Sequence, residues 1–143
     1  MNRERRDQNR VSYVVDPPLG SLELNELFAA AWEGHNPIDF QRILRRSFVY
    51  ICAYHERRLV GFVNVAWDGG VHGFVLDTTV HPDMRRRGIG GGLIDWAVAE
   101  AGARNLQWLH VDFEPHLRGF YESCGFRSTE AGVLRLDAPD RTR

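Results

Sequence analysis

The chain has 143 residues, of which 43% are hydrophobic and 26% are charged. These proportions suit one domain with one core and exclude a disordered or fibrous chain. The net charge of -1 excludes a global positive field for nucleic acid or anionic membrane. All 18 basic side chains are arginine, so chemistry that needs a lysine amine, such as a Walker A phosphate loop, is also excluded.

Domain organisation and compartment are predicted from the same observations. The two cysteines, Cys52 and Cys124, lack CxxC spacing and are too few for a disulfide scaffold, which fits a reducing compartment. The charged N-terminus has no apolar stretch behind it, so we expect a cytoplasmic protein with no membrane partner. We expect a flexible tail at 1–10, a single domain over 11–137 and a C-terminal tail at 138–143.

The predicted elements follow from hydrophobic spacing along the chain. Helical spacing predicts a first helix that begins at Ser21 and is closed by Gly34, and further helices at about 38–47, about 90–103 and 117–124. Alternating or continuous apolar runs predict strands at 11–15, 49–54, 59–67, about 72–80, 108–113 and 133–136. An antiparallel meander followed by strand, helix, strand and helix indicates a mixed α/β or α+β sheet with helices covering it.

The most informative segment is the turn after the strand that ends at Val80. Three arginines, Arg85–Arg87, precede glycines at 88, 90, 91 and 92, and the turn opens a helix. Helix-start amides, the helix dipole and adjacent arginines together favour an anion such as phosphate. The Rossmann fingerprint fails because Leu93 stands at its third glycine, whereas a tight connection without a ligand stays open as an alternative.

Two motifs carry a resemblance to the GNAT superfamily of acetyl-CoA-dependent N-acetyltransferases. Val80-x-Pro82-x-x-Arg85-x-x-Gly88-x-Gly90-x-x-Leu93 resembles the family's coenzyme A signature, and Phe120-Tyr121-x-x-x-Gly125-Phe126 resembles its last-helix segment. The resemblance implies an α/β (α+β) GNAT fold: a mixed central sheet of about six to seven strands, flanked by about four helices and splayed between the fourth and fifth strands.

The resemblance also implies where acetyl-CoA is held. Backbone amides of the turn would bind the pyrophosphate, and backbone groups of the preceding strand would pair with the pantetheine arm and stabilise the oxyanion. Tyr121 would protonate the departing thiolate. Many members carry asparagine where this chain has Glu114, so that contact is in doubt. The implied cofactor residues are Thr78, Thr79, Val80, Arg85, Arg86, Arg87, Gly88, Ile89, Gly90, Gly91, Glu114 and Tyr121.

The general base is less clear, because the positions where well-studied members carry Glu or His hold Phe74 and Leu76 here. Asp77 is adjacent, although its strand parity differs from theirs. His110, Asp112 and Glu114 alternate on one face of the next strand, which makes Asp112 a second candidate. A water relay without a dedicated base stays open, and we expect no metal.

We therefore expect acetyl transfer from acetyl-CoA to a primary amine, with a small-molecule or amino-acid-like acceptor. The acceptor pocket is predicted to draw on Trp32, His35, Trp67 and His110. A catalytically weak acyl-CoA sensor of the same fold is the alternative. We expect no nucleic-acid partner, and a homodimer is considered because family members are often dimers.

Overall fold

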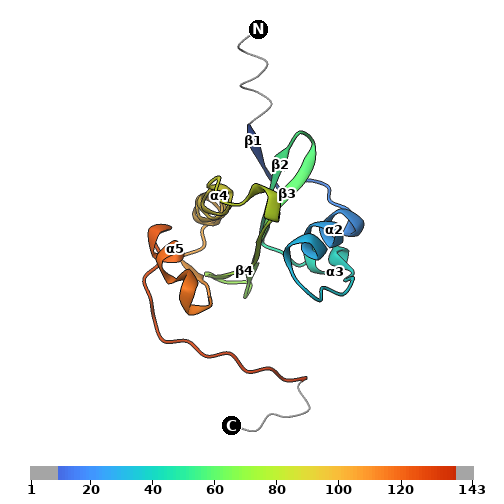
Figure 1. Ribbon diagram of the computed structural model, residues 1–143. Coiled ribbons are helices and arrows are strands. Elements are labelled where there is room, and N and C mark those ends of the chain that lie inside the picture. Colours follow the sequence, from blue (N-terminus) through green and yellow to red (C-terminus); the bar gives the residue numbers. More distant parts are fainter. Residues whose placement is uncertain (1–9, 138–143) are drawn as a thin grey trace. The chain divides into compact units, whose positions relative to one another are not determined.

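The computed structural model describes residues 10–137, which contain one five-stranded sheet in the order β1-β2-β3-β4-β5 (Figure 1). The first four strands pair antiparallel with their neighbours, and the fifth pairs parallel with the fourth, so the sheet is mixed. The strands are β1 (Val11–Val15), β2 (Val49–His55), β3 (Arg58–Trp67), β4 (His72–Val80) and β5 (Trp108–His110).

The described residues also form four α-helices and two short 3-10 turns. They are α2 (Ser21–Ala31), α3 (Phe40–Leu44), α4 (Ile89–Ala103), α5 (Arg118–Ser123), η1 (Pro82–Met84) and η2 (Pro115–Leu117). Figure 1 shows α4 against one face of the sheet and α2 with α3 against the opposite face. None of the helices in this part of the chain is long and apolar enough to cross a membrane.

The chain divides into two compact units at Val111. The sheet, α2, α3 and α4 belong to the first unit, and η2 and α5 belong to the second, which begins at Asp112. Of the tails predicted at 1–10 and 138–143, only Arg10 lies within the described residues.

The central strand β3 is buried on both sides, because helices pack against each face of the sheet. Gly61 on β3 faces α4: a Cβ added there would lie 3.0 Å from Leu93 and 3.1 Å from Ile89. Phe62 points to the other face, where its ring lies 6.1 Å from that of Phe28 on α2. The continuous apolar run of β3 therefore reflects burial under two helical layers.

The prediction of six to seven strands is wrong, because the described chain forms five. The segment predicted as the last strand, 133–136, has no regular structure, and Val133, Leu134 and Leu136 are 80%, 70% and 68% exposed. Its composition favours a strand, but a strand forms only where a neighbour accepts its backbone hydrogen bonds. No strand among residues 10–137 pairs with it.

Candidate active site

The turn between β4 and α4 leaves the start of α4 open. Gly88 is the N-cap residue and adopts a left-handed conformation with φ of 76°, which glycine permits without strain. No side chain of the described residues caps this helix, and its first internal bond runs from the Gly92 amide to the Gly88 carbonyl. The amides of 89–91 therefore have no acceptor within the helix, and the helix dipole adds partial positive charge there.

The residues around this helix start differ in what they can offer a ligand. Arg85–Arg87 are all exposed, and none of the three forms an ion pair with a carboxylate of residues 10–137. Ile89 is 2% exposed, so only its backbone can contact a ligand. A Cβ added at Gly91 would meet no atom within 4 Å, whereas one at Gly92 would collide with the Tyr13 ring. The turn thus presents amides, charge and open space together at Gly91.

His81, directly after β4, is the N-cap residue of η1. Its Nδ1 accepts a hydrogen bond from the Asp83 amide at 3.1 Å, and its Nε2 lies 2.6 Å from Arg58 Nη2. Burial, followed by the charges of Arg58 and Arg85, lowers the pKa of His81, with Asp83 opposing. A neutral imidazole accepts through one ring nitrogen only, so while Nδ1 accepts from the Asp83 amide, Nε2 cannot also accept from Arg58.

A β-bulge interrupts β4 at the start of the predicted pantetheine-binding stretch, Thr78–Val80. Phe62 pairs with Thr79 and Asn64 pairs with Leu76, so Asp77 and Thr78 together oppose the single residue Val63. Asp77 adopts the left-handed conformation with φ of 59°, which aspartate tolerates better than most residues. The bulge places the side chains of Leu76 and Thr79 on the same face of the sheet. In a regular strand these two positions would face opposite sides, so the regular alternation of faces stops after Leu76.

A chain of hydrogen bonds holds this bulge from α2. The indole N–H of Trp32, the C-cap residue of α2, donates to Thr79 Oγ1 at 3.1 Å. The Thr79 hydroxyl donates in turn to the backbone carbonyl of Asp77 at 2.9 Å. These bonds bring together Trp32, Thr79 and Asp77. Their predicted roles are acceptor binding for Trp32, cofactor binding for Thr79 and general base for Asp77.

Asp77 has the electrostatics of a proton acceptor. Its side chain is exposed, yet the protein atoms around the bulge partly desolvate it and raise the pKa of its carboxyl above the ordinary value. A carboxyl with a raised pKa is a stronger base than an ordinary aspartate. Phe74 and Leu76 lie on the same strand, 39% and 40% exposed, and cannot take a proton.

The ladder between β4 and β5 is short. It pairs His72 with Trp108, Gly73 with Leu109, and Phe74 with His110, and ends there, while β4 continues to Val80. His110 Nε2 lies 2.8 Å from His72 Nδ1, and its ring stacks on Phe74 at 4.9 Å. His110 is thus placed by its neighbours on β4.

Two predicted acceptor residues lie elsewhere in the first unit. His35 Nε2 hydrogen-bonds Asn25 Oδ1 at 2.8 Å, and its ring packs 5.6 Å from Phe28, so it closes the loop after α2. Trp67 packs on Phe48 at 4.9 Å near the hairpin turn. None of the four predicted acceptor residues, Trp32, His35, Trp67 and His110, lines the cavity of about 410 Å³ described below.

The remaining predicted residues belong to the second unit. Tyr121 on α5 is 6% exposed, and its ring packs against Phe113, Phe120 and Phe126 at 5.0, 4.9 and 5.9 Å. The strand predicted over 108–113 ends at His110, so Asp112 and Glu114 lie outside it, and Glu114 is the N-cap residue of η2.

Sequence reasoning missed a cavity of about 410 Å³ between the sheet and the α3 segment. Asn64, on β3, is 3% exposed, and its side-chain Oδ1 has no hydrogen-bond partner among the described residues. A single amide within the otherwise apolar run 59–67 was the available signal. The cavity is lined by Arg42, Ile43, Arg46, Ser47, Asn64, Ala66 and Leu76.

With this geometry in view, the comparisons with known proteins identify the family. The family model of the acetyltransferase (GNAT) domain matches residues 46–128, which is more than half of the chain. The chain belongs to the GNAT acetyltransferase family. The matched range includes the turn at Gly88 and the segment around Tyr121.

A relative found by sequence similarity is also an acetyltransferase by name. A mycothiol acetyltransferase of Nocardia farcinica is 33% identical over 111 residues, covering 73% of this chain and 36% of the relative. The chain therefore spans well under half the length of such curated relatives.

Solved structures extend the likeness to most of the chain. A GNAT-family acetyltransferase of Streptococcus pneumoniae TIGR4 superposes with a TM-score of 0.76 at 22% identity, covering 90% of this chain and 98% of that one. An aminoglycoside acetyltransferase from an uncultured soil metagenomic sample, solved with sisomicin, superposes with a TM-score of 0.72 at 16% identity, covering 92% and 98%. At these identities the likeness establishes the fold.

Proposed function

We propose that the chain transfers an acetyl group from acetyl-CoA to the primary amine of a small molecule, by direct attack in a ternary complex. The observation that carries this proposal is the uncapped start of α4, with exposed Arg85–Arg87 before it and open space over Gly91. These features fit a pyrophosphate, which needs close approach to backbone amides and positive charge. Gly88–Gly91 and the three arginines would hold it.

The bulge of β4 supports the position of the reacting group. Backbone groups of Thr78, Thr79 and Val80 would receive the pantetheine arm and the thioester carbonyl, and the bond from Thr79 to the Asp77 carbonyl keeps that backbone in one arrangement. Because a primary amine is about 0.1% neutral at pH 7, it must lose a proton before it attacks. We propose that Asp77 accepts this proton, because it lies at the bulge beside the thioester-binding backbone and its pKa is raised.

The chemistry balances with these groups. The amine nitrogen forms a bond to the thioester carbonyl carbon, the carbon–sulfur bond breaks, and coenzyme A leaves as a thiolate. Tyr121 is proposed to supply the proton to the thiolate. This role rests on the motif Phe120-Tyr121-x-x-x-Gly125-Phe126 and on family membership.

A second candidate function, an acyl-CoA sensor, is favoured by one observation: apolar Phe74 and Leu76 stand at the family's base positions. Calorimetric titration of acetyl-CoA, followed by an amine screen that monitors release of the coenzyme A thiol, separates the two. Binding with amine-dependent release supports the enzyme. Binding without release from any amine supports the sensor, and absence of binding overturns both.

A further inference from the structure

The cavity beside Asn64 has the dimensions and position of a site for a small acceptor. Its volume of about 410 Å³ falls within the range of about 300–1,000 Å³ that is usual for small-molecule sites. Leu76, on its wall, immediately precedes the bulge residue Asp77. The cavity therefore adjoins the part of β4 to which we assign the thioester.

One residue that lines this cavity, Asn64, has a buried side-chain oxygen without a hydrogen-bond partner among the described residues. Asn64 pairs with Leu76 across the sheet, so its side chain points to the face that carries α2 and α3. Its Oδ1 is buried without a hydrogen bond to any described residue, and the residue itself lines the cavity. An orphaned buried acceptor is costly, so a donor from a ligand, such as an ammonium N–H, would satisfy it.

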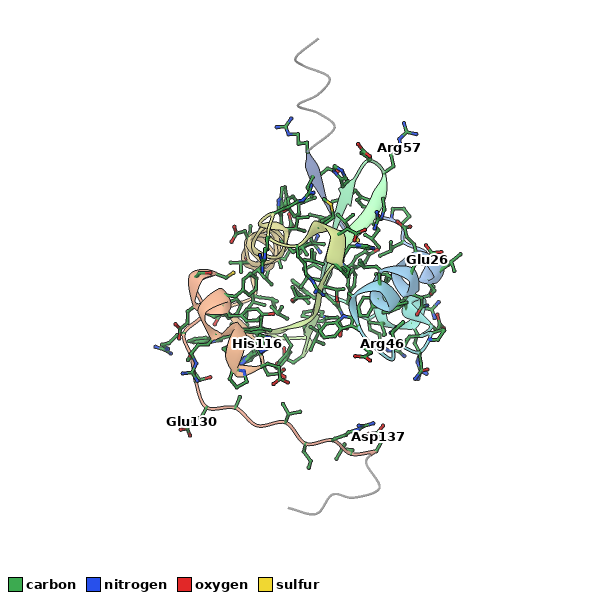
Figure 2. The ribbon with its side chains drawn as sticks, in the orientation of Figure 1. Glu26, Arg46, Arg57, His116, Glu130 and Asp137 are labelled. Atoms are coloured by element: carbon green, nitrogen blue, oxygen red, sulfur yellow. The ribbon has the colours of Figure 1, made fainter. Side chains whose placement is uncertain are left out.

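Positive charge lines the same cavity. Arg42 on α3 and Arg46 just after it both reach the wall, and Figure 2 shows Arg46 on the α3 side of the sheet. Among residues 10–137 neither guanidinium pairs with a carboxylate, and the lining contains no acidic residue. Arginine binds carboxylate and phosphate through paired N–H groups, so the open partner here is an anion.

We propose that this cavity binds the acceptor of the reaction, and that the acceptor is a small amine that also carries an anionic group, either a carboxylate or a phosphate. Asn64 Oδ1 accepts a hydrogen bond from the amine, and Arg42 and Arg46 bind the anion. That the bound molecule is the acceptor of the reaction rests on the proposed acetyl transfer. That the cavity prefers anionic amines rests on its lining residues alone. Amine and anion must lie a few bonds apart to fit the volume.

The first test measures binding without acetyl-CoA. The side-chain amide resonance of Asn64, assigned by its loss in Asn64→Leu, is followed by NMR during titration with β-alanine, O-phosphoethanolamine or propylamine. We expect at least one of the anionic amines to bind at least about tenfold more tightly than propylamine. Which of the two binds distinguishes carboxylate from phosphate.

Matched variants identify the side chains responsible. The double variant Arg42→Gln/Arg46→Gln is expected to lose that preference, because both cations are removed. Arg45→Gln serves as the control, because Arg45 is an exposed neighbour that does not line the cavity. Equal binding of propylamine, no response to any of the three amines, or the same behaviour in both variants would overturn the inference.

The second test measures turnover with acetyl-CoA for the same three amines. A preference in kcat/KM for an anionic amine, abolished in the double variant and kept in Arg45→Gln, supports the inference. Equal acetylation of propylamine overturns the inference and leaves the proposed function standing. Selective binding of anionic amines by a chain that does not bind acetyl-CoA supports the selectivity of the cavity and overturns the proposed function.

Discussion

At the scale of single residues, Asn64 shows a conflict between stability and binding. A buried side-chain oxygen without a partner destabilises a fold by about 1–3 kcal/mol. We expect Asn64→Leu, which keeps the number and branching of side-chain heavy atoms and removes the polar ones, to raise the free energy of unfolding by about 1 kcal/mol. The same change should lower kcat/KM for the acceptor about tenfold, because it removes the ligand's hydrogen-bond acceptor.

Urea denaturation and steady-state kinetics on the same preparation check both halves. Ala66→Val, which changes the apolar wall of the same cavity, controls for altered shape. An Asn64→Leu protein that is less stable and equally active would show that the amide serves the fold.

Asp77 is expected to set the acid side of the pH profile. Its raised pKa means that the carboxyl becomes protonated at a higher pH than an ordinary aspartate, so kcat/KM falls as pH drops through that raised value. Asp77→Asn should lower kcat/KM about 100-fold and remove this fall. The measurement is kcat/KM against pH for both proteins. An unchanged acid limb in Asp77→Asn would favour a water relay or Asp112 as the base.

Tyr121 is predicted to act on the chemical step. Tyr121→Phe keeps the ring that packs against Phe113, Phe120 and Phe126 and removes only the hydroxyl. We expect kcat to fall about 100-fold while the Kd of acetyl-CoA changes less than about twofold. Calorimetry gives the Kd, and thiol release gives kcat. Equal activity in the variant would limit Tyr121 to packing.

At the scale of elements, the start of α4 offers a paired test of the phosphate turn. Added side chains at Gly91 and Gly102 would both meet no protein atom within 4 Å, and both positions lie in α4. Gly91→Val should weaken acetyl-CoA binding about tenfold by occupying space over the open amides, whereas Gly102→Val near the other end should not. Calorimetric Kd values decide this, and equal effects of the two changes would contradict the assignment.

The elements also show where sequence reasoning stops. β4 spans His72–Val80 as predicted, because it is rich in aromatic and β-branched residues that favour a strand locally. The bulge at Asp77 was not predicted, because it is defined by which residues of β3 lie opposite. In a regular strand Asp77 would lie on the face opposite Phe74 and Leu76. At the bulge the strand is not regular, so this expectation does not apply to Asp77.

At the scale of the whole molecule, the two cysteines lie in different units, and the reactivity of each thiol measures how well it is protected there. Cys52 is fully buried in β2, and burial raises the pKa of its thiol to about 12, whereas Cys124 in the second unit is partly exposed. At neutral pH we expect a thiol reagent to modify Cys124 readily and Cys52 only as fast as the sheet opens. Both should react in denaturant.

Mass spectrometry of peptides after timed alkylation measures the two rates. Cys124→Ser leaves Cys52 alone and gives the opening rate directly. Rapid modification of Cys52 under native conditions would show that β2 is not protected by the surrounding core.

By itself the sequence determined what local spacing and short motifs encode. These are the five strands and four helices that formed, the glycine turn before α4 and membership of the acetyltransferase family. Neighbouring residues decide such features, because periodicity and turn chemistry act over a few positions.

The tertiary structure alone decided the features that join distant segments. The Trp32–Thr79–Asp77 hydrogen bonds, the bulge and the cavity between Asn64 and Arg46 each join residues far apart in the chain. The segment 133–136 formed no strand for the same reason: a strand requires a partner as well as a favourable composition.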